Sequence, residues 1–335
     1  MSKIPVFVGL DYHREAVQVC VLDGAGRVLV NRSCANDAAT IGAVASRHGR
    51  PQVAAIEACC GSADLAEELI EVCGWNVVQC QAGIVARMKN NPDKTDYGDA
   101  RLLADLARVG YLPRVWLPPE RIRQLRQLVR YRGQLAAERK RHKQQVGALL
   151  RQERLPLAAG TTWTKRWTAA LRGLAWPRLS RLIVESHLEE IQILSRRIVE
   201  LERTLEEELR DDAVATWLRT QPGVGLITAA TLRAEIGDVG RFRTGKQLAR
   251  FCGLSPCNAS SGARRADAGL IRAGNPELKR VLIEAAHRLI RYDPRWTASA
   301  VRLKQAGKPA SVVVAATANR WMRGLFHAWK ERAAA

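Results

Sequence analysis

The order of secondary-structure patterns in the first 110 residues constrains the fold more than any other feature of the sequence. Apolar alternation and turn residues predict strands and helices in the order βββαβαβα. The strands are expected near residues 5–11, 16–22, 27–33, 52–57 and 76–81, and the helices near residues 38–48, 62–73 and 95–109. Asp23-Gly24-Ala25-Gly26 predicts the turn of the first hairpin, and Gly74-Trp75 the end of a helix. This order predicts a mixed α/β domain.

Helical patterns replace the α/β pattern after three prolines, Pro113, Pro118 and Pro119. A long helix is expected over residues 119–155 and a second one over roughly residues 178–210. The second helix repeats apolar residues at heptad spacing, with His187 at its one polar seam position. The two helices are expected either to pair within the chain or to form a dimeric coiled coil, and the sequence favours neither arrangement.

These patterns predict three parts. Three antiparallel strands followed by α/β units is the order of the RNase H-like fold, so residues 1–112 are expected to form an RNase H-like (RuvC-like) α/β domain. Residues 113–212 are expected to form a basic helix and a coiled-coil connector. Residues 213–335 are expected to form a mostly α-helical domain with an element that resembles a helix-hairpin-helix.

Charge is distributed unevenly along the chain. The net charge is +20, although residues 1–110 carry 11 Lys and Arg against 13 Asp and Glu and so contribute −2. The excess of basic residues indicates a polyanionic partner such as DNA or RNA. Nine basic residues and two acidic ones lie between residues 120 and 143, which favours nucleic-acid contact over a merely solvated face. The candidate contacts in this helix are Arg126, Arg130, Lys140 and Lys143.

The apolar residues and the cysteines limit the cellular compartments in which the protein is expected to act. No stretch approaches 18 uninterrupted apolar residues, and the N-terminus lacks a signal-peptide pattern, so we expect no membrane partner and a cytoplasmic location at the bacterial nucleoid. The eight cysteines form no Cys-x-x-Cys pair, which argues against a zinc ribbon. We expect them to be reduced and buried.

Four acidic residues form the strongest candidate for chemistry. Asp11 and Glu57 each end an apolar strand, and these two strands lie side by side in an RNase H-like sheet. Asp96 and Asp99 are three residues apart at a helix start and share one face. Such a cluster can hold hard cations, Mg²⁺ or Mn²⁺, for phosphoryl transfer. Each acid alone has an ordinary alternative: a turn, a pair with arginine, or a helix capping box.

Two glycine-containing loops are further candidates. Pro222-Gly223-Val224-Gly225 has the spacing of a helix-hairpin-helix turn, where the backbone at Gly223 and Gly225 would contact a phosphate; the alternative is an ordinary tight turn. Farther on, a serine loop runs from Ser260 through Ser261 to Arg264 and Arg265, and Arg272 follows. A serine there could attack phosphorus while guanidinium groups hold the phosphate oxygens, or the loop could simply be polar.

Taken together, these motifs resemble the DEDD insertion-sequence transposases, whose members are guided by a structured bridge RNA. The resemblance rests on Gly9-Leu10-Asp11, Ile56-Glu57-Ala58, Asp96-Tyr97-Gly98-Asp99, Pro222-Gly223-Val224-Gly225 and Ser260-Ser261-Gly262, and it covers nearly the whole chain. It implies DNA and a guide RNA as partners and a homo-oligomer, from dimer to tetramer. It also implies that Ser261 forms a covalent link to DNA. A lysine common after the Ser-Gly pair is replaced here by Ala263, Arg264 and Arg265.

Two other functions remain open from the sequence. A metal-dependent nuclease of the junction-resolving kind would need the four acids and water but no serine nucleophile. A nucleic-acid-binding scaffold would need neither.

Overall fold

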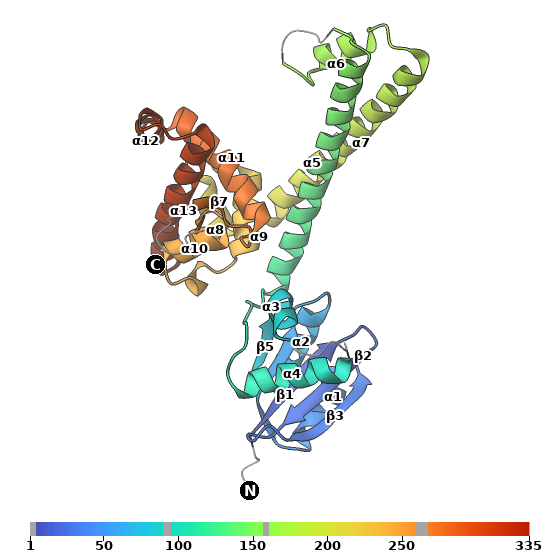
Figure 1. The fold of residues 1–335 in the computed structure, drawn as a ribbon, viewed down its shortest axis with the longest axis vertical. Helices are drawn as coiled ribbons and strands as arrows, with labels where there is room; N and C mark the ends of the chain where they lie inside the picture. Colours follow the sequence, from blue (N-terminus) through green and yellow to red (C-terminus); the bar gives the residue numbers. More distant parts are fainter. Residues whose placement is uncertain (1–4, 90–94, 157–160, 259–266, 335) are drawn as a thin grey trace. The chain divides into compact units, whose positions relative to one another are not determined.

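The computed structural model describes residues 5–89, 95–156, 161–258 and 267–334. Contacts divide the chain into two compact units, residues 1–120 and 121–335 (Figure 1). The first is a mixed α/β unit and the second is almost entirely helical. The predicted three-part division of the chain stays a prediction.

A five-stranded sheet organises the first unit. Its strands lie in the order β3-β2-β1-β4-β5. Their bounds are Pro5–Tyr12 (β1), Ala16–Leu22 (β2), Val28–Ala35 (β3), Arg50–Glu57 (β4) and Val77–Cys80 (β5). The first three strands are antiparallel, whereas β4 is parallel to β1 and β5 to β4. This arrangement fits the RNase H-like fold that the strand order predicts.

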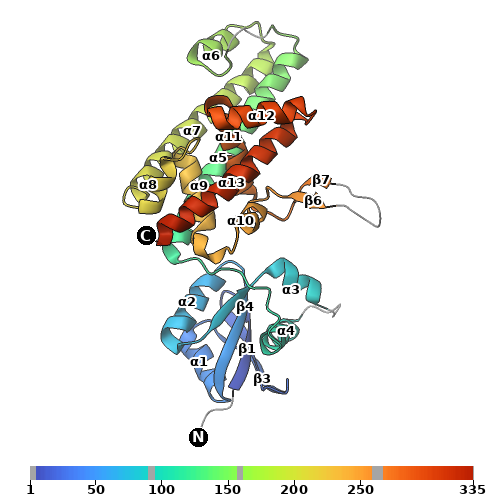
Figure 2. The same ribbon diagram turned by 90° about the vertical axis from the view of Figure 1, so that its left-hand side faces the viewer.

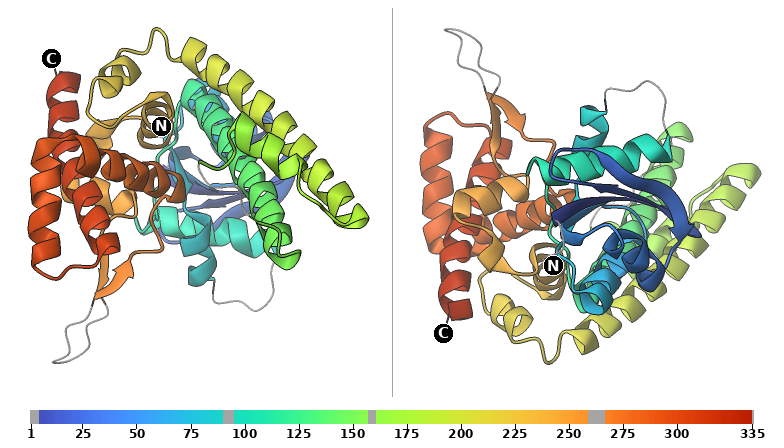
Figure 3. Two further views of the ribbon diagram at one scale, coloured as in Figure 1. Left: turned by 90° about the horizontal axis from the view of Figure 1, so that it is seen from above. Right: turned by 90° about the horizontal axis from the view of Figure 1, so that it is seen from below.

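Helices cover both faces of this sheet. Helices α1 (Ala38–Ser46) and α2 (Ser62–Cys73) lie on one face, and α3 (Ala82–Met88) and α4 (Asp96–Arg108) lie on the other (Figures 2 and 3). Strand residues alternate between the two faces. Val8 and Leu10 of β1 pack into the core beneath α1 and α2, while Ala55 of β4 packs against Leu103 of α4.

Gly9 allows α4 to lie directly on β1. A Cβ atom added at Gly9 would collide with the carbonyl oxygen of Ala100 and the amide nitrogen of Ala104. The contact is therefore made between the two backbones, with small residues on both sides. Gly9 sets how closely the start of α4 approaches the end of β1.

A long helical hairpin begins the second unit. Its helices are α5 (Glu120–Gln152) and α7 (Arg178–Glu208), with the short α6 (Lys165–Arg172) at the far end (Figure 1). Leu135 of α5 packs with Leu194 and Ile198 of α7. Nδ1 of His142 lies 2.9 Å from Nδ1 of His187, so the polar seam position faces a second histidine. Of the two predicted arrangements, the structure contains the pairing within the chain.

The remaining residues of the second unit form a cluster of helices with one small β-hairpin. The helices are α8 (Ala213–Arg219), α9 (Leu226–Ile236), α10 (Gly245–Phe251), α11 (Pro276–Tyr292), α12 (Pro294–Gln305) and α13 (Ala310–Ala334). A 3-10 turn covers Val239–Arg241, and β6 (Pro256–Asn258) pairs with β7 (Asp267–Leu270). The core joins α9, α10, α11 and α13 through Ile236, Leu248, Leu282 and Met322. The helical character was predicted, whereas the hairpin and α6 were not.

The cysteine prediction was partly wrong. All eight cysteines are free, as expected, and Cys20, Cys80 and Cys252 are buried. Cys34, Cys73 and Cys257 are half-buried, and Cys59 and Cys60 are exposed in the loop that follows the carboxyl end of β4. None of the helices described here combines the length and apolarity needed to cross a membrane.

Candidate metal centre

Strand pairing places two of the four predicted acids next to one another. Leu10 of β1 is in register with Ile56 of β4 in the parallel pair, and Asp11 and Glu57 are the next residues on each strand. Both follow the side-chain alternation to the face covered by α4, because Leu10 and Ile56 belong to the core on the other face. The two carboxylates therefore leave neighbouring strands on the same side of the sheet.

Helix α4 supplies the other two acids from its first turn. Thr95 is the N-cap residue, and its side chain accepts a hydrogen bond from the Gly98 amide at 3.1 Å. Asp96 and Asp99 lie in the first turn, where the helix dipole favours negative charge. The Asp99 side chain is 12% exposed and that of Asp96 is 58% exposed. The helix start thus offers one buried and one open carboxylate.

His13 joins the open half of this cluster. Its Nε2 atom lies 3.4 Å from Oδ2 of Asp11 and 3.4 Å from Oδ1 of Asp96. Ligand atoms of these three residues all lie within 4.8 Å of one another, so one cation could contact all three. His13 was not among the predicted site residues, although its position two residues after a strand-end acid was an available signal.

Lys89 joins the buried half. Its Nζ atom lies 2.7 Å from Oδ2 of Asp99 and 4.0 Å from Oε2 of Glu57. Lys89 is the C-cap residue of α3, a helix that the sequence patterns did not predict. The lysine was missed for that reason, since nothing local links it to the acids.

The surroundings of Asp11 disfavour the ionised form of its carboxyl group. Burial raises the pKa of Asp11, and the nearby carboxylates of Asp99 and Asp96 raise it further; His13 and Lys89 act in the opposite direction. A raised pKa means that ionising this carboxyl group costs more free energy in the folded chain than in the unfolded chain. A divalent cation would relieve that cost, so the donor set fits a hard metal ion.

Two arginines predicted to contact nucleic acid are paired inside the second unit. Arg130 donates to both carboxylate oxygens of Glu235, from Nε at 2.7 Å and from Nη2 at 2.9 Å. Arg126 lies 3.5 Å from the same carboxylate and also donates to the Ala234 carbonyl at 3.2 and 3.0 Å. The Glu235 side chain is only 1% exposed. Both guanidinium groups therefore have a structural role here, and a nucleic-acid contact by them stays a prediction.

The other predicted basic contacts differ in accessibility. Lys140 and Arg272 are exposed. Lys143 places its ammonium 5.0 Å from the centre of a Trp163 ring, and burial lowers its pKa, as does the nearby charge of Arg139. Lys140 and Arg272 are consequently the candidates open to a ligand.

The glycine turn predicted as a phosphate contact joins α8 to α9. Gly223 has φ +78°, which glycine adopts readily, and an added Cβ would lie 3.3 Å from the Ala285 carbonyl oxygen. Gly225 is the N-cap residue of α9. This turn geometry also suits two packed helices, so the phosphate contact stays a prediction.

The predicted nucleophile and its two arginines, Ser261, Arg264 and Arg265, lie outside the described residues. Their flanking strands β6 and β7 are antiparallel, with Pro256 opposite Leu270. The amide of Ile271 donates to the Ser255 carbonyl at 3.0 Å and continues this pairing.

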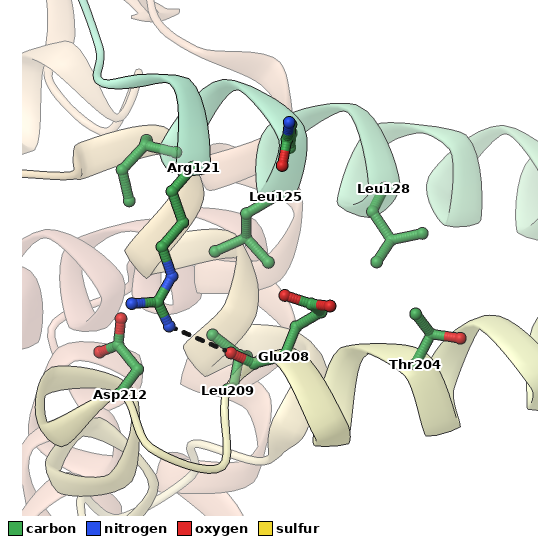
Figure 4. A pocket seen from close by; sticks show the side chains of 9 residues that line it. Arg121, Leu125, Leu128, Thr204, Glu208, Leu209 and Asp212 are labelled. Atoms are coloured by element: carbon green, nitrogen blue, oxygen red, sulfur yellow. Dashed lines mark hydrogen bonds between the residues drawn. The ribbon is translucent and has the colours of Figure 1, made fainter.

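A pocket of about 230 Å³ lies at the base of the helical hairpin (Figure 4). Leu125 and Leu128 of α5 face Leu209 across it. Arg121 points toward the end of α7 and donates to the Glu208 carbonyl at 3.3 Å. Asp212, at the rim, is the N-cap residue of α8 and pairs with an arginine of α9. These polar groups terminate helices, so the pocket offers little for chemistry.

Comparisons with known proteins connect both units to one family. A transposase family model of the DEDD IS110 type matches residues 8–154, and a model described as the transposase IS116/IS110/IS902 family matches residues 215–301. The chain belongs to the DEDD-type insertion-sequence transposases. The first match of this DEDD family contains all four acids of the cluster, and the second contains the glycine turn and the β6–β7 region.

Several transposases are similar to this DEDD-family chain over much of its length. The transposase for insertion sequence element IS1328 of Yersinia enterocolitica is 27% identical over 82% of the chain and 82% of its own length. The transposase for IS1111A of Coxiella burnetii is 25% identical over 85% of the chain and 78% of its own length. The y4qE protein of Sinorhizobium fredii, whose name describes a putative transposase, is 31% identical over 68% of the chain. The match covers 56% of the length of that relative. The names of all three relatives describe transposases.

Proposed function

We propose that this protein cuts and rejoins DNA as the transposase of an insertion sequence, with a divalent-metal site formed by Asp11, Glu57, Asp96 and Asp99. The observation that carries the proposal is the convergence of these carboxylates. Two come from adjacent strand ends and two from the first turn of a helix lying on the same sheet face. Phosphoryl transfer needs such a cluster, because closely spaced cations must share carboxylate ligands.

The donor set fits Mg²⁺ or Mn²⁺. Carboxylate oxygens are the ligands both ions prefer, and the His13 nitrogen beside Asp11 and Asp96 is compatible with Mn²⁺. Burial raises the pKa of Asp11, with a smaller contribution from the nearby carboxylates of Asp99 and Asp96, and a bound cation would favour its ionised form. When bound, the metal would neutralise charge on the scissile phosphate and assist ionisation of the attacking hydroxyl.

The fold of the chain would hold the four metal-binding carboxylates in place. The sheet register fixes Asp11 and Glu57, while the close contact at Gly9 fixes the start of α4 with Asp96 and Asp99. Preset positions of this kind avoid the cost of ordering ligands during the reaction.

Ser261 is proposed as the nucleophile, on the strength of the family resemblance. Its oxygen would bond to phosphorus as the bridging P–O bond breaks and the DNA hydroxyl leaves with a proton. Attack by a second DNA hydroxyl would reverse this step and release the serine. Strand exchange by this route conserves one phosphodiester bond for each bond cut.

The partners are proposed to be donor and target DNA, a bridge RNA that selects them by base pairing, and further copies of this chain. The exposed Lys140 and Arg272 are candidate contacts to these nucleic acids. Action on DNA would place the protein at the bacterial nucleoid.

Two substitutions test the proposal. Asp11→Asn should lower strand exchange by roughly a thousandfold, about 4 kcal/mol of lost transition-state stabilisation. Ser261→Ala should abolish both recombination and the covalent protein–DNA adduct, measured with labelled DNA on denaturing gels. Glu15→Gln is the control, because Glu15 is 89% exposed and lies in the same unit. Cleavage retained without an adduct in Ser261→Ala would contradict the serine role and favour a nuclease.

A further inference from the structure

The carboxylate cluster divides into two halves that differ in how their charge is balanced. Asp11 and Asp96 face the imidazole of His13, which can act as a neutral ligand. Glu57 and Asp99 face the ammonium of Lys89. A lysine ammonium carries a full charge that an imidazole need not carry. An incoming cation therefore meets a positive charge in the Glu57–Asp99 half and a side chain that can be a neutral ligand in the Asp11–Asp96 half.

We propose that Lys89 is a built-in counter-ion that occupies the Glu57–Asp99 half of the metal centre. A first divalent ion would bind at Asp11, His13 and Asp96, and a second would bind only after the Lys89 ammonium has moved away. The inference rests on the proposed function, because it takes the carboxylate cluster to be a metal centre.

The position of the ammonium supports this competition. Nζ of Lys89 lies 2.7 Å from Oδ2 of Asp99, at the distance of a charge-assisted hydrogen bond. It therefore engages an oxygen lone pair that a metal ion would use. The side chains of Lys89, Asp99 and Glu57 are 24%, 12% and 25% exposed, so solvent screens the three charges only in part. A divalent ion entering this half would meet a positive charge already in place.

The lysine is also attached in a way that permits its departure. Lys89 has extended backbone angles, φ −70° and ψ 113°, and stands just beyond the last helical residue of α3, Met88. Its unbranched four-carbon side chain can swing without moving that helix. A DNA phosphate at the centre would offer the ammonium a new anionic partner, which links loading of the second ion to the presence of DNA.

This ordering has a consequence for control of the chemistry. Without DNA, Lys89 would weaken binding of the second divalent ion, so the site would be fully loaded more readily around a phosphate. The ammonium would then contact that phosphate rather than Asp99. Lys89 would thus act both as a block in the resting chain and as a positioning residue in the complex.

The test is a titration of the full-length chain with Mn²⁺ in the absence of DNA. Binding is measured by calorimetry and by electron paramagnetic resonance of the free Mn²⁺. Lys89→Gln removes the charge and keeps a similar length. It should raise the affinity of the weaker binding step by roughly tenfold or more, because a cation close to the ligands is gone. Lys89→Arg keeps the charge and should bind Mn²⁺ as the wild-type chain does.

Arg87→Gln is the matched control, since it removes one positive charge from an exposed position on the same helix. It should leave both binding steps unchanged. If Lys89→Gln binds Mn²⁺ no better than the wild type, while Asp11→Asn weakens binding, the lysine inference is wrong and the metal centre stands. If no Mn²⁺ binding is lost in Asp11→Asn, both the metal centre and the lysine inference are overturned. Circular dichroism melts establish that each variant is folded.

Discussion

The two units each contain a cluster of charged side chains, and the clusters are balanced in opposite ways. In the second unit, Glu235 is almost fully buried and is matched by Arg126, Arg130 and the amide of Asn275, which donates to it at 2.8 Å. Among the described residues of the first unit, Lys89 faces Glu57 and Asp99, and His13 faces Asp11 and Asp96. Two guanidinium groups surround one carboxylate in the second unit, whereas among the described residues of the first unit four carboxylates face one lysine and one histidine.

The difference separates a carboxylate that is held by its own basic partners from a cluster of carboxylates that suits a bound cation. A buried carboxylate with bidentate guanidinium contacts is held by its partners, and removing any of them leaves an uncompensated charge. A cluster that remains short of positive charge costs stability unless something else binds there. Arg126 and Arg130 of α5 were predicted as nucleic-acid contacts from local charge alone, and both pair with Glu235 in the fold; whether they also contact nucleic acid stays a prediction.

The largest change in stability is expected from removing the buried carboxylate of Glu235. Glu235→Ala should lower the free energy of unfolding by about 3–5 kcal/mol, because Arg126 and Arg130 lose their buried partner. Urea denaturation followed by circular dichroism measures this loss. Glu206→Ala is the control: Glu206 and Arg219 form an exposed pair, so its loss should cost no more than about 1 kcal/mol. Equal costs for the two variants would mean that burial does not distinguish the pairs.

A smaller change in stability should come from the contact between β1 and α4 at Gly9, which brings the four carboxylates together. Gly9→Ala should destabilise the chain by about 1–3 kcal/mol, since the added methyl group forces α4 away from β1. The displacement of Asp96 and Asp99 should also lower strand exchange by about a hundredfold. Gly83→Ala in α3 is the control, because a Cβ there meets no atom within 4 Å. Normal activity in Gly9→Ala would show that the acids do not depend on this contact.

The smallest effect should have the opposite sign. In the absence of metal, Asp11→Asn should slightly stabilise the chain, because it removes a carboxylate whose pKa is raised by burial and by neighbouring acids. Between the unfolded and folded pKa values, the folded chain binds more protons than the unfolded chain. Wild-type stability should therefore fall as pH rises through that window, and the variant should lack this contribution.

Urea denaturation in EDTA at several pH values measures this dependence, with Glu15→Gln as the exposed control. Adding Mn²⁺ should reverse the order, since the wild type gains binding free energy and Asp11→Asn does not. A variant less stable than the wild type in EDTA at neutral pH would mean that Asp11 is favourably balanced without metal.

Much of this organisation was predictable from local patterns. The five strands, the helices that became α1, α2, α4, α5 and α7, and the positions of the four acids all followed from periodicity and from acids placed at element ends. The boundaries shifted by a few residues: the long helix ends at Gln152 rather than at residue 155. Helix α3 was missed because it is short and its pattern weak.

What the sequence by itself determined is which elements form and which of their ends carry acids, because periodicity and turn chemistry act over a few residues. Only the tertiary structure decided the partners of each charge. Lys89 lies between Glu57 and Asp99, and Arg130 binds Glu235 across 105 positions of the chain. Such contacts depend on how distant segments pack, and no local pattern encodes that distance. The four acids of the candidate metal centre can therefore be found in the sequence, whereas the basic side chains that face them are decided only by the fold.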